Sequence, residues 1–226
     1  MVTKKGVSIE EISNRYPVLY HMAEADTWES IKKHGLRSTS ALLDLFQVNG
    51  EQRTTIEKEH RPDSVEISHR RYGKAVIRDQ KPMSDADLKR CLIGLQPSDW
   101  YQVLNRHVFF WPTRKRLSTM LNAKTYKSQK HTVLTLDAGR LLKDHEAQVR
   151  LTAINSGCTK PMARPRGKQT FMTLDQFPFS ERRGKYGVGN AVAEVAIEYS
   201  VPRIDMYVIS VDHMLSDRLL ENIYKA

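Results

Sequence analysis

Short apolar runs alternate with short amphipathic segments along the whole chain, and this interleaving limits the possible folds more than any other feature of the sequence. The runs that predict strands are residues 18–22, 108–111, 132–137, 149–154, 192–199 and 206–211. Helical spacing or helix-start signals predict helices from Ser8 and over residues 24–34, 39–46, 84–92, 116–126, 138–143 and 214–224. Residues 47–75 predict a loop with some helix, and residues 158–185 an irregular segment rich in Pro, Gly and Arg. Strands and helices mixed in this way predict an α+β fold in a single domain over residues 1–226.

The composition is that of an ordinary globular protein, with 40% apolar and 27% charged residues in a chain of 226. No apolar run approaches the roughly 20 residues that a transmembrane helix needs, and Met1–Glu10 lacks the apolar stretch of a signal peptide. Cys91 and Cys158 lie far apart and in no metal-ligand spacing, so neither a disulfide nor a metal site is expected. We therefore expect a cytoplasmic protein with no membrane partner.

Positive charge is concentrated in two stretches of the chain, whose formal net charge is +10. No acidic residue occurs between Asp99 and Asp137, and none between Glu146 and Asp175, although both stretches contain several Lys and Arg residues. Clustered cations attract phosphates and bind polyanions by releasing counterions. This distribution favours a polyanionic ligand over a simple excess of surface lysine.

Glu194 is the residue whose position most needs a chemical explanation. It follows Ala193 and begins the apolar strand of residues 192–199, and burying a carboxylate costs several kcal/mol unless it is paired. Glu198 has the same parity in that strand and is the competing candidate. The common phosphate-binding, dinucleotide-binding, metalloprotease and serine-hydrolase motifs are absent.

Three blocks of sequence, in this order, resemble the ADP-ribosyltransferase superfamily, most closely the DarT-like nucleic-acid ADP-ribosyltransferase toxins. The blocks are Leu19-Tyr20-His21-Met22 with the later His34-Gly35-Leu36, then Val108-Phe109-Phe110-Trp111-Pro112, and finally Ala193-Glu194-Val195-Ala196-Ile197 with Ser200-Val201-Pro202. The resemblance implies a central split antiparallel sheet flanked by helices, and NAD as the co-substrate.

The resemblance also implies roles for individual residues. Glu194 would be the catalytic carboxylate that stabilises the oxocarbenium-like transition state. His21, with Tyr20 and Met22 beside it in the first strand, would line the NAD pocket. Arg78 is preferred to Arg70 and Arg71 as the arginine that these enzymes use. Two aromatic residues could stack on nicotinamide or simply pack in the core: Trp111 and Tyr126.

The basic segment of residues 158–185, which precedes the last block, indicates what kind of acceptor the resemblance implies. The residues expected to bind it are Arg164, Arg166, Lys168 and Phe171. They suit a base of single-stranded RNA or DNA, because arginine binds phosphate and an aromatic ring stacks on an unpaired base. Enzymes of this kind often act as toxins of toxin–antitoxin pairs or in phage defence, so an antitoxin protein is a candidate partner. The alternatives are protein ADP-ribosylation, RNA 2′-phosphotransfer and a non-catalytic nucleic-acid-binding module.

Overall fold

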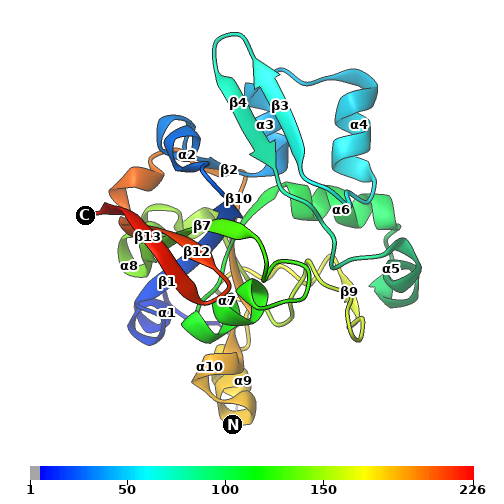
Figure 1. Cartoon of the computed structure of the whole chain (residues 1–226). Coiled ribbons are helices and arrows are strands. Elements are labelled where there is room, and N and C mark those ends of the chain that lie inside the picture. Colours follow the sequence, from blue (N-terminus) through cyan, green and yellow to red (C-terminus); the bar gives the residue numbers. More distant parts are fainter. Residues whose placement is uncertain (1–5) are drawn as a thin grey trace.

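A computed structural model describes residues 6–226 (Figure 1). Its helices are α1 (Ile9–Arg15), α2 (Trp28–His34), α3 (Thr39–Leu45), α4 (Gly50–Lys58), α5 (Asp85–Cys91), α6 (Pro97–Asn105), α7 (Arg114–Leu121), α8 (Ala138–Asp144), α9 (Phe179–Tyr186) and α10 (Val188–Ala191), with short 3₁₀ turns η1 (Glu146–Gln148) and η2 (Ile204–Met206). Its strands are β1 (Val18–Glu24), β2 (Leu36–Arg37), β3 (Val65–His69), β4 (Gly73–Ile77), β5 (Leu92–Ile93), β6 (His107–Phe110), β7 (Lys130–Asp137), β8 (Val149–Thr152), β9 (Arg166–Gly167), β10 (Glu194–Glu198), β11 (Ser200–Val201), β12 (Val208–Leu215) and β13 (Arg218–Lys225).

Two antiparallel sheets form the centre of the molecule. One has the strand order β1-β7-β12-β13, and the other has the order β6-β10-β8. They meet where Tyr20 of β1 and Trp111, just after β6, exchange backbone hydrogen bonds of 3.0 and 2.8 Å. Helices and antiparallel sheets mixed along the chain confirm the α+β class, and each of the predicted strands is present.

The central strands are buried because helices cover both faces of the first sheet. On one side, Ile12 of α1 and Leu141 of α8 pack in the main apolar core with residues of both sheets. On the other side, Leu117 and Leu121 of α7 pack against Met22 and other apolar residues of the sheet. Burying so much apolar surface is the main force that holds the sheet between these helices.

The first and last of the three sequence blocks that carry the resemblance lie side by side. β2 pairs with β11, so that Leu36 is opposite Val201. Gly35, which ends α2, has a φ of 78°, and a Cβ there would lie 2.6 Å from the carbonyl oxygen of Pro202. The glycine is therefore required both by its left-handed backbone and by the close approach of the other block.

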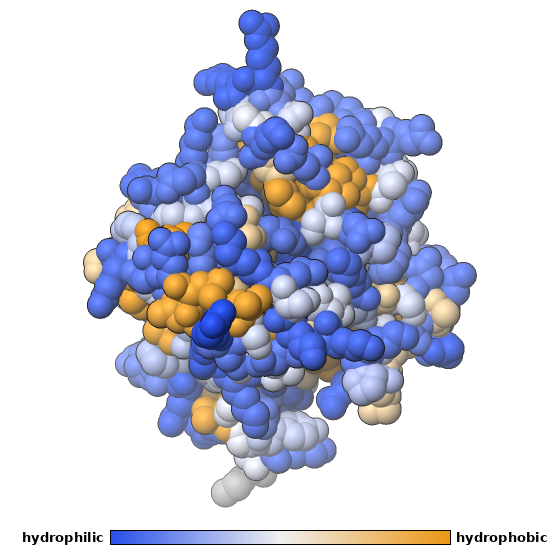
Figure 2. Space-filling model, viewed as in Figure 1, coloured by the Kyte–Doolittle hydropathy of each residue, from blue (hydrophilic) through white to orange (hydrophobic). Residues whose placement is uncertain are grey.

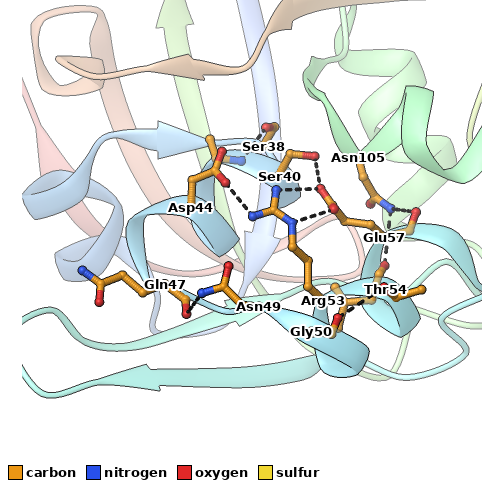
Figure 3. A network of polar contacts seen from close by, with 12 residues as sticks. Ser38, Ser40, Asp44, Gln47, Asn49, Gly50, Arg53, Thr54, Glu57 and Asn105 are labelled. Atoms are coloured by element: carbon orange, nitrogen blue, oxygen red, sulfur yellow. Dashed lines mark hydrogen bonds and ion pairs between the residues drawn. The ribbon is translucent and has the colours of Figure 1, made fainter.

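A smaller layer stands beside the central sheets and includes the β3–β4 hairpin with α3 and α4 (Figure 1). Figure 3 shows Arg53 of α4 between Asp44 of α3 and Glu57, with nitrogen–oxygen distances of 2.6 and 2.9 Å. Asn105, at the end of α6, donates to the carbonyl oxygen of Glu57 at 3.0 Å. These bonds tie α3, α4 and α6 together at the base of the hairpin.

Two of the sequence predictions for the elements are wrong. Residues 47–75 contain α4 and the β3–β4 hairpin rather than mainly loop. The predicted helix over residues 214–224 is instead the end of β12 and the strand β13, joined at Ser216, whose φ of 53° breaks any helix. Smaller differences are that β1 runs on to Glu24, that α2 begins only at Trp28, and that α6 and α9 lie where no helix was predicted.

The C-terminal hairpin also carries apolar residues at the surface. The face in Figure 2 is mainly hydrophilic, and one apolar patch on it lies over the β12–β13 hairpin. Leu219 and Leu220 of β13 are 55% and 42% exposed. Within residues 6–226, no helix has the length and apolar character needed to cross a membrane.

Candidate active site

A cavity of about 940 Å³ lies where the hairpin layer meets the two central sheets. This volume is typical of small-molecule sites. Residues predicted from distant parts of the sequence meet on its wall: His21, Met22, Arg78, Trp111, Tyr126 and Glu194. Tyr20 is half-buried beside this group in the core under α7 and does not line the cavity.

Glu194 begins β10 and is only 3% exposed, at the end of the strand that faces the cavity. Its Oε2 accepts a hydrogen bond from the backbone N–H of Ser156 at 2.9 Å and lies 3.1 Å from the hydroxyl of Thr152, whose one hydrogen is shared with the carbonyl oxygen of Ile154 at 2.7 Å. Burial raises the pKa of this carboxyl, while those hydrogen bonds and the nearby Arg116 act to lower it. The carboxylate is therefore held in a fixed orientation in a partly dehydrated place.

Glu198, at the other end of β10, has different surroundings. Its side chain is 44% exposed and pairs with Arg150 at 2.8 Å. Glu198 is not part of the cavity wall. Of the two carboxylates in this strand, only Glu194 is placed to act on a molecule in the cavity.

His21 presents a hydrogen-bond acceptor to the same cavity. Its Nδ1 lies 2.8 Å from the carbonyl oxygen of Phe109, and a carbonyl can only accept, so Nδ1 carries the proton. Burial, reinforced by the positive charge of Arg78, lowers the pKa of His21 to about 4. The ring is thus neutral at pH 7, and its Nε2 can accept a hydrogen bond from a hydroxyl or an amide.

Arg78 follows β4, and some of its N–H donors have no partner among the described residues. Its Nη1 donates to the carbonyl oxygen of Met22 at 2.9 Å, and its guanidinium lies 4.7 Å from the centre of the Tyr126 ring. Its Nε is 3.9 Å from Glu24. Across residues 6–226, the buried Nε and Nη2 atoms find no hydrogen-bond partner. A buried donor without a partner costs free energy, and a bound anion would remove that cost.

The two aromatic candidates, Tyr126 and Trp111, differ in how deeply their rings are buried. Tyr126 is buried, and its hydroxyl donates to Asp79 at 2.7 Å, so its ring supports Arg78 from the core. Trp111 is half-buried on the cavity wall, next to the junction of the two sheets. Of these two candidates, Trp111 therefore offers the ring that a flat ligand could reach more easily.

The residues predicted to bind the acceptor do not line the cavity. Arg164 and Lys168 are exposed on the loop before α9. Arg166 is 2% exposed and donates to the carbonyl oxygens of Arg164, Ser156 and Cys158 at 3.0, 2.9 and 2.9 Å. Phe171 stacks on His107 with their ring centres 4.4 Å apart. The buried Arg166 thus has a structural role, which corrects the prediction of an acceptor contact there, whereas Phe171 is half-buried and its acceptor contact stays a prediction.

Arg116 and the partners of Glu194 are not among the residues predicted from the sequence. Arg116 lines the cavity, and Glu194 is among the charges that act on its pKa. One signal was available: Thr113 caps α7, so that Arg114, Lys115 and Arg116 form a first turn with no acidic residue, where the helix dipole disfavours cations. Thr152 and Ser156 gave no signal, because their role depends on a register that only the folded sheet shows.

Comparison with known proteins gives one family. The family described as a family of unknown function, DUF7002, matches the chain over residues 17–208. No curated protein matches the chain.

Proposed function

Because the chain belongs to DUF7002, a family of unknown function, we propose its activity from the cavity itself: NAD-dependent transfer of ADP-ribose to nucleic acid. The observation that carries the proposal is the meeting of His21, Arg78 and Glu194 on one cavity wall. These residues come from β1, from the position directly after β4 and from the start of β10. The resemblance to the DarT-like enzymes assigns a role in NAD chemistry to the same three positions.

The chemistry of the wall fits NAD group by group. The unsatisfied nitrogens of Arg78 suit the diphosphate, because guanidinium groups bind phosphate oxygens in pairs. The Nε2 of His21 suits a ribose hydroxyl or the carboxamide N–H of nicotinamide. Trp111 offers an aromatic face. A cavity of about 940 Å³ with both apolar and polar walls is large enough for such an elongated ligand.

Glu194 is placed to stabilise the reaction electrostatically. The bond between nicotinamide and ribose breaks with its electron pair going to nicotinamide, and positive charge develops on the ribose carbon. A carboxylate fixed by Thr152 and Ser156 stabilises that charge without reorganising. An oxygen or nitrogen of the acceptor then forms the new bond to that carbon and releases a proton. Since the ionised carboxylate is needed, the rate should fall as the pH is lowered through the pKa of Glu194, which lies above the ordinary value for glutamate.

The acceptor is proposed to be a base of single-stranded RNA or DNA, and the protein to act as a toxin that an antitoxin neutralises. The concentration of cations in two acid-free stretches supports a nucleic acid over a protein acceptor.

Labelled NAD tests this proposal when it is incubated with the protein and, separately, with RNA, single-stranded DNA and a protein extract. We expect label on one class of nucleic acid and release of nicotinamide. Glu194→Gln, which keeps the shape and loses the charge, should lower the transfer rate by about 100-fold or more. Glu198→Gln is the matched control, because it removes a carboxylate from the same strand outside the cavity. Equal rates in the two variants, or label only on protein, would contradict the proposal.

A further inference from the structure

The turn of the β3–β4 hairpin holds two arginines that do not line the cavity. His69 pairs with Gly73, so the turn consists of Arg70, Arg71 and Tyr72. Gly73 has a φ of 77°, the left-handed backbone typical of the residue that closes a three-residue loop. Figure 1 shows the hairpin projecting from the body of the molecule, and Figure 2 shows mainly hydrophilic side chains at this end. Both arginines are accordingly exposed.

The positive charge of this turn is not neutralised. Within residues 6–226, the guanidinium groups of Arg70 and Arg71 make no ion pair and no hydrogen bond. The one carboxylate in residues 65–77 is that of Glu66, and Lys74 pairs with it at 2.8 Å. Neighbouring cations that lack a carboxylate partner attract a polyanion, because its binding releases counterions.

Aromatic rings support the same turn. The guanidinium of Arg71 lies 5.6 Å from the centre of the Tyr72 ring, and His69 stacks on Tyr72 with ring centres 4.8 Å apart. The buried Phe46 lies behind both rings, at 6.0 Å from that of Tyr72 and 6.4 Å from that of His69. Guanidinium planes and aromatic rings both stack on unpaired bases. Cations combined with such rings favour a single-stranded nucleic acid over an acidic peptide.

Direct contacts join the hairpin to the cavity wall. The hydroxyl of Ser30 in α2 donates to the carbonyl oxygen of Lys74 at 3.2 Å. His34, the last residue of α2, donates from Nε2 to the carbonyl oxygen of Tyr72 at 3.0 Å. Ser30, His34 and Lys74 all line the cavity. The strand β4 leads from the turn to Arg78, over about 17 Å at about 3.4 Å per residue. The turn therefore lies on a continuation of the cavity wall, remote from the reacting groups.

We propose that the turn of the β3–β4 hairpin binds the single-stranded nucleic acid outside the cavity. Arg70 and Arg71 contact its phosphates, and the group formed by Arg71, Tyr72 and His69 contacts its bases. The nucleotide to be modified then occupies the cavity, and the hairpin holds nucleotides farther along the same strand. The inference rests on the proposed function for the identity of the acceptor, and it names the surface that holds that acceptor.

Oligonucleotide binding in the absence of NAD tests this surface separately from catalysis. The probe is a fluorescently labelled single-stranded oligonucleotide, as RNA and as DNA, titrated at several salt concentrations. The hairpin variant combines Arg70→Gln with Arg71→Gln, which removes two charges and no side-chain hydrogen bond or ion pair within residues 6–226. We expect its affinity for the oligonucleotide to fall about tenfold. The slope of log affinity against log salt should fall by about 1.4, since each phosphate contact on a single strand contributes about 0.7.

The matched control combines Arg15→Gln with Arg140→Gln. It removes the same charge from exposed side chains of α1 and α8, which do not line the cavity. We expect its affinity to change by less than about twofold, because charges farther from the ligand than a Debye length of about 10 Å are screened. Equal binding by the two double variants would overturn the proposal. Competition by polyglutamate as strong as that by unlabelled oligonucleotide would also overturn it, in favour of an acidic peptide.

Transfer of label from NAD separates this proposal from the proposed reaction. At low oligonucleotide concentration, the hairpin variant should transfer about tenfold less label than the unaltered protein, with its affinity for NAD unchanged. If the unaltered protein transfers no label while the hairpin variant still weakens oligonucleotide binding, the proposed reaction fails and the binding surface stands. If the unaltered protein transfers label and the hairpin variant binds and transfers equally well, the binding surface fails and the reaction stands.

Discussion

The loop before α9 and the end of β4 each withdraw an arginine from solvent, but they surround it differently. In the loop, Arg166 donates to three backbone carbonyl oxygens and lies over the ring of Trp100. At the end of β4, Arg78 donates to one carbonyl oxygen and leaves two buried nitrogens without a partner in the described chain. Donors satisfied by the backbone indicate a structural arginine, whereas unsatisfied donors on a cavity wall indicate a ligand.

Arg166→Met should give the largest effect, a loss of about 3 kcal/mol or more in the free energy of unfolding. Methionine fills the space over Trp100 but leaves the carbonyl oxygens of Ser156 and Cys158 without their donors, at about 1–3 kcal/mol each. Urea denaturation measures this loss. Arg164→Met, an exposed neighbour on the same loop, should change stability by less than about 0.5 kcal/mol. Similar losses in the two variants would remove the structural role of Arg166.

Arg78→Met should show the opposite pattern. The variant loses the groups proposed to bind the diphosphate, and hydrogen bonds to charged groups contribute about 1.5–3 kcal/mol, so NAD affinity should fall by about 10- to 100-fold. Stability should fall by no more than about 1.5 kcal/mol, because the bond to Met22 is lost together with the weaker contacts to Tyr126 and Glu24, while the cost of two buried unpaired nitrogens is removed. Calorimetric titration with NAD and urea denaturation test the two parts. A large loss of stability with unchanged NAD binding would make Arg78 a structural residue like Arg166.

The contrast between these arginines also marks the limit of prediction from sequence. Arg78 could be selected because it directly follows an apolar pair that forms β4. Arg166 could not be distinguished from Arg164, because its role depends on which carbonyl oxygens the loop brings to it. Only the folded chain contains that information.

The same limit applies to the fold. The strands β1, β6 and β10 are predictable because each is a short run of mostly apolar residues in a polar context. The helix predicted over residues 214–224 failed because Leu215 and Leu219 suit helical spacing as well as a hairpin. The turn at Ser216 and Asp217 decides between them, since Asp217 accepts hydrogen bonds from α7 through Ser118 and Asn122. Such a tertiary contact overrides local spacing.

His21 gives a pH-dependent test on the same wall as Arg78. Its pKa is lowered to about 4 in the folded protein, against about 6.5 for a free histidine. The unfolded chain therefore binds more protons between these values, and the contribution of His21 to stability is present above pH 6.5 and lost as pH falls towards 4. We expect wild type to lose about 1–2 kcal/mol relative to His21→Asn between pH 7 and pH 5. Urea denaturation at both pH values checks this, and a pH-independent difference between the two proteins would contradict it.

Tyr126→Phe should have the smallest effect and sharpens the contrast between the arginines. The variant keeps the ring that supports Arg78 and loses only the hydroxyl that donates to Asp79. We expect a loss of about 1 kcal/mol in stability, typical of one hydrogen bond, and less than about a threefold change in NAD affinity. Tyr126→Leu, which also removes the aromatic face, should weaken NAD binding further because Arg78 loses its cation–π support. If Tyr126→Phe lowers NAD affinity as much as Arg78→Met does, the hydroxyl and Asp79 position the arginine, and the ring alone does not account for its orientation.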